Sequence, residues 1–179
     1  VVFYVNPDGA PNPQVVEDVG AALTAWSNVA GCSLRLVNGG ASSACSTQRT
    51  VNAISFNNCD GRFSPSAECS RIIALGGLRW ESEVVRQVNG QSYVTAAYGF
   101  ISFNPYSACS FDNHCDLREV ATHELGHALG LGHSQHPDAT MYGAAHFDGR
   151  CAGITEDDVT GIAFVYPIND LGSRPLAID

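Results

Sequence analysis

Lysine is absent from this chain of 179 residues, and all nine basic side chains are arginine. Covalent catalysis through a lysine amine is therefore excluded. Charged residues make up only 15% of the chain and the formal net charge is −9. This charge argues against nucleic acid or an anionic membrane as a partner, because both attract positive surfaces. No apolar run approaches the length of a bilayer-spanning helix, so we expect no membrane span.

Internal repeats, low-complexity tracts and linkers are also missing, while 45% of the residues are hydrophobic. We therefore expect one globular domain over residues 1–179, with an irregular tail at 168–179. Helical periodicity and capping signals predict helices over about 13–29 and 155–166. Short apolar runs between turn-forming residues predict strands at 1–5, 33–37, 50–56, 71–75 and 98–103. This mixture of helices and strands predicts an α+β fold.

The seven cysteines include no C-x-x-C pair of the kind found in zinc ribbons. So many cysteines in a short chain favour disulfides and a secreted, extracellular protein. Connectivity stays open, although short spacings favour the pairs Cys32–Cys45, Cys59–Cys69 and Cys109–Cys115. That choice leaves Cys151 over. It would then either join a disulfide with a partner from another pairing, or be a thiol that pairs with a missing propeptide.

The stretch HELGHALGLGH begins at His123 and contains three histidines. His123 and His127 are four residues apart, so on a helix both imidazoles project from one face. This spacing suits two ligands of one tetrahedral zinc ion. Glu124 is placed to reach a water on the metal rather than to bind the metal itself. Gly130 permits a left-handed exit from the helix, which would return His133 as a third ligand.

The helix that would carry this motif has its own signals. Asp116, three residues before Glu119, predicts the helix cap. Apolar residues at helical spacing predict the buried face: Leu117, Val120, Ala121, Leu125, Ala128 and Leu129. The remaining histidines, His114, His136 and His146, lie in polar stretches and are expected near the surface rather than on the metal.

Three protein ligands leave one zinc position for water, which distinguishes a catalytic zinc site from a closed structural one. Glu124 would take a proton from that water and deliver it to a leaving amine, so the expected reaction is hydrolysis of an amide bond. Two other functions stay open. One is a non-catalytic, zinc-stabilised binding or adhesion module, and the other is a hydrolase of non-peptide amides.

The long histidine motif, followed by Ser134 and by Met141 in the sequence ATMYG, resembles the metzincin metallopeptidases and within them the matrixin branch. The segments DLREVATHELGHALGL and TEDDVTGIAFVYP are also similar to matrixins in order and spacing. The resemblance implies a zincin-like domain with a mixed twisted sheet, an N-terminal helix, an active-site helix and a C-terminal helix. It further implies a secreted zinc endopeptidase, which we expect to be a microbial relative. Met141 would form a structural turn beneath the zinc.

The resemblance also implies protein or peptide substrates that lie along an edge strand, and a zymogen whose propeptide is not in this sequence. We expect a monomer. Calcium is a second candidate ion because of the acidic excess, although Asp60, Asp112, Asp116 and Asp148 lack a calcium-loop spacing. One departure concerns specificity: Gly143-Ala144-Ala145 replaces the proline and tyrosine expected after the methionine turn. The substrate preference of the family therefore does not carry over.

Overall fold

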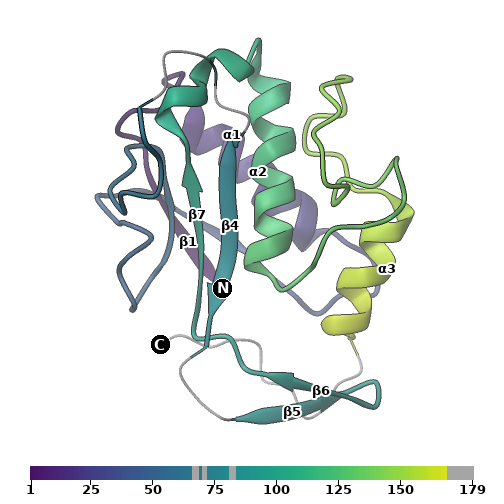
Figure 1. Ribbon diagram of the computed structural model, residues 1–179. Helices are drawn as coiled ribbons and strands as arrows, with labels where there is room; N and C mark the ends of the chain where they lie inside the picture. Colours follow the sequence, from purple (N-terminus) through teal and green to yellow (C-terminus); the bar gives the residue numbers. More distant parts are fainter. Residues whose placement is uncertain (66–68, 70–71, 81–83, 169–179) are drawn as a thin grey trace.

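The computed structural model describes residues 1–65, 69, 72–80 and 84–168, and its elements are shown in Figure 1. In this part of the chain a five-stranded sheet has the order β2-β1-β3-β7-β4. Its strands are β1 (Val2–Asn6), β2 (Val37–Ala41), β3 (Asn52–Ser55), β4 (Ala74–Arg79) and β7 (Tyr98–Phe103). The pairs among β2, β1, β3 and β7 are parallel, and β4 pairs antiparallel with β7. The sheet is thus mixed, and β4 forms one of its edges.

Three α-helices accompany the sheet: α1 (Val15–Ser27), α2 (His114–Ala128) and α3 (Glu156–Val165). A short 3₁₀ helix, η1 (Pro105–Ser110), leads from β7 towards α2. The α+β expectation is therefore confirmed, as are the strands near the start of the chain and at 98–103 and the helices near 13–29 and 155–166. The predicted strand at 50–56 is also found, shortened to β3.

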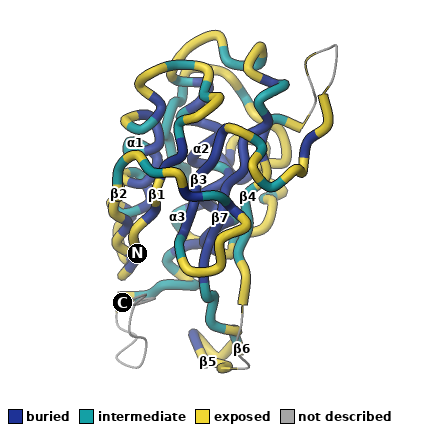
Figure 2. The backbone as a smooth tube through the Cα atoms, turned by 90° about the vertical axis from the view of Figure 1, so that its left-hand side faces the viewer, coloured by how far each residue is buried: buried dark blue, intermediate teal, exposed yellow. Residues whose placement is uncertain are grey.

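The core lies between the sheet and helices α1 and α2, as the dark segments in Figure 2 show. Ile54 of β3 and Ile101 of β7 face it, and both are fully buried. Trp26 of α1 is also fully buried and donates its indole N–H to the carbonyl of Thr122 in α2 at 2.9 Å. The apolar face predicted for α2 is buried throughout. Burial of these apolar side chains fixes α2 against the sheet.

The cap of α2 differs from the prediction. The helix begins at His114, and Asn113 is its N-cap, accepting hydrogen bonds from the backbone of Cys115 and Asp116. Asp116 completes a capping box from the third helical position. The prediction that Asp116 is the cap residue was wrong, because the side chain of Asn113 reaches the free N–H groups of the first turn. Glu119 is left for another role.

The predicted strand at 33–37 is also wrong, since β2 starts only at Val37. Leu34 and Leu36 are buried by packing against the core instead of pairing in the sheet. The glycine-containing run that follows pairs with β1. At Gly39 an added Cβ would lie 2.7 Å from the ring of Tyr4, so the absence of a side chain lets the two strands approach.

The strand predicted at 71–75 is displaced towards the C-terminus, because β4 covers Ala74–Arg79; residues 70 and 71 lie outside the described part. An additional hairpin, β5 (Val85–Val88) with β6 (Gln91–Val94), was not predicted. It projects from the end of β4 below the sheet in Figure 1. Asn89 at its turn donates to the carbonyl of Phe164 in α3 at 2.8 Å.

The disulfides are Cys45–Cys59, Cys69–Cys109 and Cys115–Cys151. All three predicted pairs are therefore wrong, and Cys151 is a disulfide partner instead of a free thiol. Cys32, predicted to be paired, is a buried free thiol. Proximity along the chain was misleading because the fold places Cys115, at the start of α2, beside a loop that is distant in sequence.

Among the described residues, no helix has the length and apolar character needed to cross a membrane. The tail predicted at 168–179 lies outside the described residues beyond Ile168. That residues 1–179 form one domain stays a prediction.

Candidate metal centre

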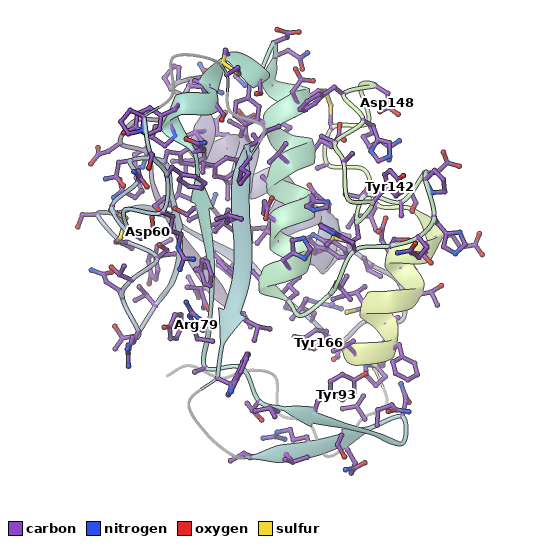
Figure 3. All side chains as sticks on the ribbon, viewed as in Figure 1. Asp60, Arg79, Tyr93, Tyr142, Asp148 and Tyr166 are labelled. Atoms are coloured by element: carbon purple, nitrogen blue, oxygen red, sulfur yellow. A yellow bond between two sulfur atoms is a disulfide. The ribbon has the colours of Figure 1, made fainter. Side chains whose placement is uncertain are left out.

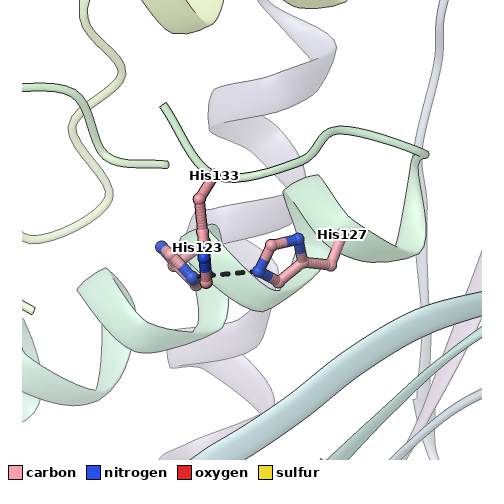
Figure 4. Close-up of side chains that lie close together, drawn as sticks. All are labelled: His123, His127 and His133. Atoms are coloured by element: carbon pink, nitrogen blue, oxygen red, sulfur yellow. Dashed lines mark hydrogen bonds between the residues drawn. The ribbon is translucent and has the colours of Figure 1, made fainter. Parts of the chain in front are cut away.

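The three histidines of the long motif come together at the C-terminal half of α2 (Figure 4). His123 and His127 lie on successive turns of the helix. Their ligand nitrogens and that of His133 all lie within 4.8 Å of one another. Among the described residues, this is the group of histidine, cysteine or carboxylate side chains that could hold a metal ion.

His133 reaches this group because α2 ends sharply. Gly130 has a φ of +99°, in the left-handed region that favours glycine. The backbone N–H of Leu131 donates to the carbonyl of Gly126 at 2.9 Å, and that of Gly130 donates to His127 at 3.1 Å. This pair of hydrogen bonds is a Schellman motif, which reverses the chain direction. The predicted return of the chain after Gly130 is thus found.

The imidazoles on α2 are oriented by backbone carbonyls. Nδ1 of His123 lies 2.7 Å from the carbonyl of Thr140, and Nδ1 of His127 lies 2.8 Å from that of Leu131. A carbonyl only accepts, so each Nδ1 carries the proton and each Nε2 keeps its lone pair. The two Nε2 atoms are 3.1 Å apart. Two lone pairs at this distance suit a shared cation.

Burial favours the neutral, metal-binding form of these rings. It lowers the pKa of His123 to about 4, with the hydrogen bond to Thr140 acting in the opposite direction. Burial also lowers the pKa of His127. A neutral imidazole is the form that binds a metal. At neutral pH these rings are therefore in the form that can bind a metal ion.

Glu124 lies beside the histidines and is 8% exposed. Burial raises the pKa of its carboxyl group to about 7, and a backbone hydrogen bond from Gly76 acts against that rise. Gly76 belongs to the edge strand β4. A Cβ at Gly76 would lie 2.2 Å from the carbonyl oxygen of Glu124. Sequence analysis missed Gly76, whose lack of a side chain lets β4 lie against α2 at the site.

Met141 forms a packed floor next to α2. It is 2% exposed. Its backbone N–H donates to Oδ1 of Asp158 at 2.9 Å, while Oδ2 of the same carboxylate accepts from the N–H of Thr140 at 2.9 Å. Asp158 is buried in the first turn of α3 and also completes the capping box with Thr155. The carboxylate of Asp158 thus caps α3 and also holds the methionine turn.

We expect Gly126→Ala to destabilise the fold by about 1–3 kcal/mol through overpacking. An added Cβ at Gly126 would lie 2.2 Å from the sulfur of Met141 and 3.2 Å from the ring of Trp26. Gly161→Ala in α3 is the matched control, since the Cβ there meets only Leu131 at 3.6 Å. It should stabilise by up to about 1 kcal/mol, the helix preference for alanine. Denaturant unfolding measures both, and an equally stable Gly126→Ala protein would show a loosely packed floor.

A cavity of about 580 Å³ lies beside the histidines. Residues 72–77, from the approach to β4 and the strand itself, line one side, and α2 lines another with Glu119, His123 and Glu124. Residues 143–145 complete the wall. The cavity therefore joins the candidate metal site to the edge strand.

The other histidines and acids have partners of their own. His114 and Arg118 contact the buried carboxylate of Asp18, each at 2.8 Å. His136 lies 3.5 Å from Asp157. Asp60 accepts hydrogen bonds from Ser46, Arg62 and Ser102, and Asp148 pairs with Arg150. Each of these described side chains therefore has a contact within the protein.

An edge strand lies beside a helix that carries two of three converging histidines, and a buried methionine turn packs next to them. This arrangement defines a zincin-like α+β domain of the metzincin class. A family model described as Matrixin (Peptidase M10) matches residues 2–167. This chain belongs to the matrixin family, whose members are zinc metalloendopeptidases.

The chain is similar to metalloproteinases of plants and mammals. Metalloendoproteinase 1-MMP of Arabidopsis thaliana is 38% identical over 81 residues, which are 45% of this chain and 22% of that protein. Matrilysin of Rattus norvegicus is 50% identical over 56 residues, 31% of this chain and 21% of that protein. Interstitial collagenase of Oryctolagus cuniculus is 41% identical over 61 residues, 34% of this chain and 13% of that protein. The matched part thus covers less than a quarter of each relative.

Proposed function

We propose that this chain is a secreted zinc endopeptidase in which His123, His127 and His133 hold the catalytic zinc and Glu124 is the general base. The observation that carries the proposal is the convergence of three imidazoles, two of them with Nδ1 held by a carbonyl and Nε2 directed to a shared point. Membership of the matrixin family supports the same activity.

Zinc bound to these histidines would lower the pKa of a water molecule and polarise the carbonyl of the scissile bond. The contribution of the chain itself is to place a base beside the three histidines. Glu124 directly follows a ligand and lines the cavity, so its carboxylate can accept the proton of the attacking water. The same carboxyl group then gives the proton to the leaving amine. Burial of Glu124 holds it in one place for both transfers.

The substrate would be an extended peptide that pairs with β4. This strand is at the edge of the sheet, and its residues line the cavity beside Glu124. Backbone hydrogen bonds along an edge strand bind a peptide largely independently of its sequence, while side-chain pockets provide selectivity. Protein or peptide substrates therefore fit this cleft better than a small non-peptide amide.

Secretion is supported by the three disulfides. A zymogen with a propeptide, a monomeric state and a single domain over residues 1–179 remain part of the proposal.

A digest of casein and of quenched peptide libraries tests the activity. We expect cleavage with zinc, loss of cleavage when a chelator removes the metal, and recovery when zinc is restored. Zinc binding without cleavage of any substrate would contradict the proposal and favour a zinc-stabilised binding module.

A further inference from the structure

Glu119 is a buried carboxylate that the proposed reaction does not use. It is 3% exposed and lies on α2 one turn before His123. It also lines the cavity that contains Glu124. A buried carboxylate destabilises a fold unless hydrogen bonds satisfy it. Its partners therefore indicate what it does.

Those partners belong to the loop that follows the methionine turn. Oε1 of Glu119 accepts from the backbone N–H of His146 at 2.6 Å, and Oε2 accepts from that of Phe147 at 3.0 Å. The imidazole of His146 adds a third contact, with Nδ1 3.2 Å from Oε1. Its Nε2 lies 2.6 Å from the carbonyl of Pro137. The ring thus bridges Glu119 and the carbonyl of Pro137, so His146 ties Glu119 to a second part of the loop.

The loop is attached to α2 at three successive turns. Cys115, Glu119 and His123 are four residues apart and share one face of the helix. Cys115 forms the disulfide with Cys151, and Nδ1 of His123 meets the carbonyl of Thr140. The chain thus runs antiparallel along the helix from residue 140 to residue 151. Figure 3 labels Tyr142 and Asp148 on this segment, which lies beside α2.

Residues 143–145 lie between the attachments at His123 and Glu119. They are exposed, and as Gly143-Ala144-Ala145 they have almost no side chain with which to pack. They nevertheless form part of the cavity lining, to which Ile72 and Ile73 also belong. The position of this wall therefore depends on the attachments at its two ends.

We propose that Glu119 is a positioning residue, which fixes residues 143–145 as one wall of the pocket for an apolar substrate side chain. The inference rests on the function proposed above. Both carboxylate oxygens are engaged by the loop, so Glu119 acts through the shape of the wall and not by contact with substrate. It thereby determines which substrate side chain this pocket accepts.

Glu119→Gln tests this, because an amide has one acceptor oxygen and its NH₂ group would oppose the second N–H. The substrates are the two quenched peptides, differing only in leucine or alanine at one residue next to the scissile bond, that the wild type distinguishes most strongly. We expect kcat/KM for the leucine peptide to fall about tenfold through KM, with less than about threefold change for the alanine peptide. Equal losses on both peptides, or no loss, would overturn the proposal. So would a wild-type preference for lysine that the variant abolishes, because Glu119 would then contact substrate directly.

Arg118→Gln is the matched control. Arg118 is the next residue on α2, but its guanidinium faces Asp18 of α1 instead of the loop. This variant also loses one charge and one ion pair, and we expect its leucine-to-alanine selectivity to equal that of the wild type. A changed selectivity here would indicate a general effect of weakening α2 and overturn the specific role of Glu119.

Hydrogen exchange separates this inference from the proposed activity. In the zinc-loaded protein the amides of His146 and Phe147 should exchange at least about tenfold faster in Glu119→Gln than in the wild type. Unchanged exchange would overturn the inference whether or not any peptide is cleaved. Faster exchange in a protein that cleaves nothing would support the attachment of the loop, and would contradict both the peptidase function and the pocket role that rests on it.

Discussion

Glu124→Gln should lose peptide hydrolysis by about 10²–10⁴-fold while it keeps its zinc. Glutamine has nearly the shape of glutamate, so the contact between α2 and β4 at Gly76 is preserved. It cannot accept a proton from the attacking water or return one to the leaving amine. The loss should appear in kcat, because the group acts on the reaction rather than on peptide binding. Peptide kinetics and metal analysis on the same sample measure the two quantities.

Glu156→Gln provides the control for this substitution. Glu156 is an exposed carboxylate in the first turn of α3. Glu156→Gln makes the same chemical change outside the cavity, and this variant should retain wild-type kinetics. An active Glu124→Gln protein would show that another group, or no protein base, accepts the proton. Loss of zinc together with activity would instead assign Glu124 a role in holding the metal.

His133→Ala should lose zinc and activity together. This residue comes from the segment after Gly130, whereas the other two histidines belong to α2. Without it the site keeps two imidazoles on successive turns, which is fewer than the three protein ligands typical of catalytic zinc. We expect zinc affinity to fall at least about 100-fold, on the scale of losses from changes around a metal site. Competition with a chromogenic chelator measures the affinity.

His136→Ala is the matched histidine variant. It lies three residues further on, is exposed, and is outside the group that could hold the metal. We expect unchanged zinc affinity and activity. If His133→Ala retains its zinc with wild-type affinity, the metal centre is not the one proposed. If His136→Ala loses zinc equally, the segment as a whole and not one imidazole is responsible.

Several local predictions succeeded because neighbouring residues decide them. The helix over 155–166 was predicted from Thr155 and the acidic first turn, and these residues form its capping box. The strand at 98–103 was predicted from its apolar run and has those bounds. The exit of α2 was predicted from Gly130, whose positive φ is accessible without strain to a residue that lacks a Cβ.

Predictions failed where distant segments compete for the same partner. The run at 33–37 has strand-like residues, yet Val37–Ala41 takes the place beside β1, since Gly39 leaves room for Tyr4. The disulfides were assigned by short spacing, but the distance that matters is the one through space. Cys115 meets Cys151 because the loop after Met141 returns along α2.

Glu119 shows a signal that the sequence contained and that was not used. It lies four residues after Cys115 and four before His123, on the same helical face as the proposed metal ligands of α2. A carboxylate at that position is expected to have a partner when the face is buried. Its partner could not be identified from the sequence, because His146 and Phe147 are distant along the chain and have no helical relation to it.

The sequence by itself predicted the pair of histidines on one face of α2, the glutamate beside them and the turn that returns His133, because helical periodicity and glycine geometry are local properties. It also identified the matrixin family through the motif and its spacing to Met141. The tertiary structure alone decided which strand lies over the site, which cysteines pair and what fixes the pocket wall. Those features depend on backbone approach at Gly76 and on buried carboxylates at Glu119 and Asp158 that find N–H donors in distant segments. A buried carboxylate destabilises the protein unless hydrogen bonds satisfy it, and only the folded chain decides which N–H donors lie close enough to do so.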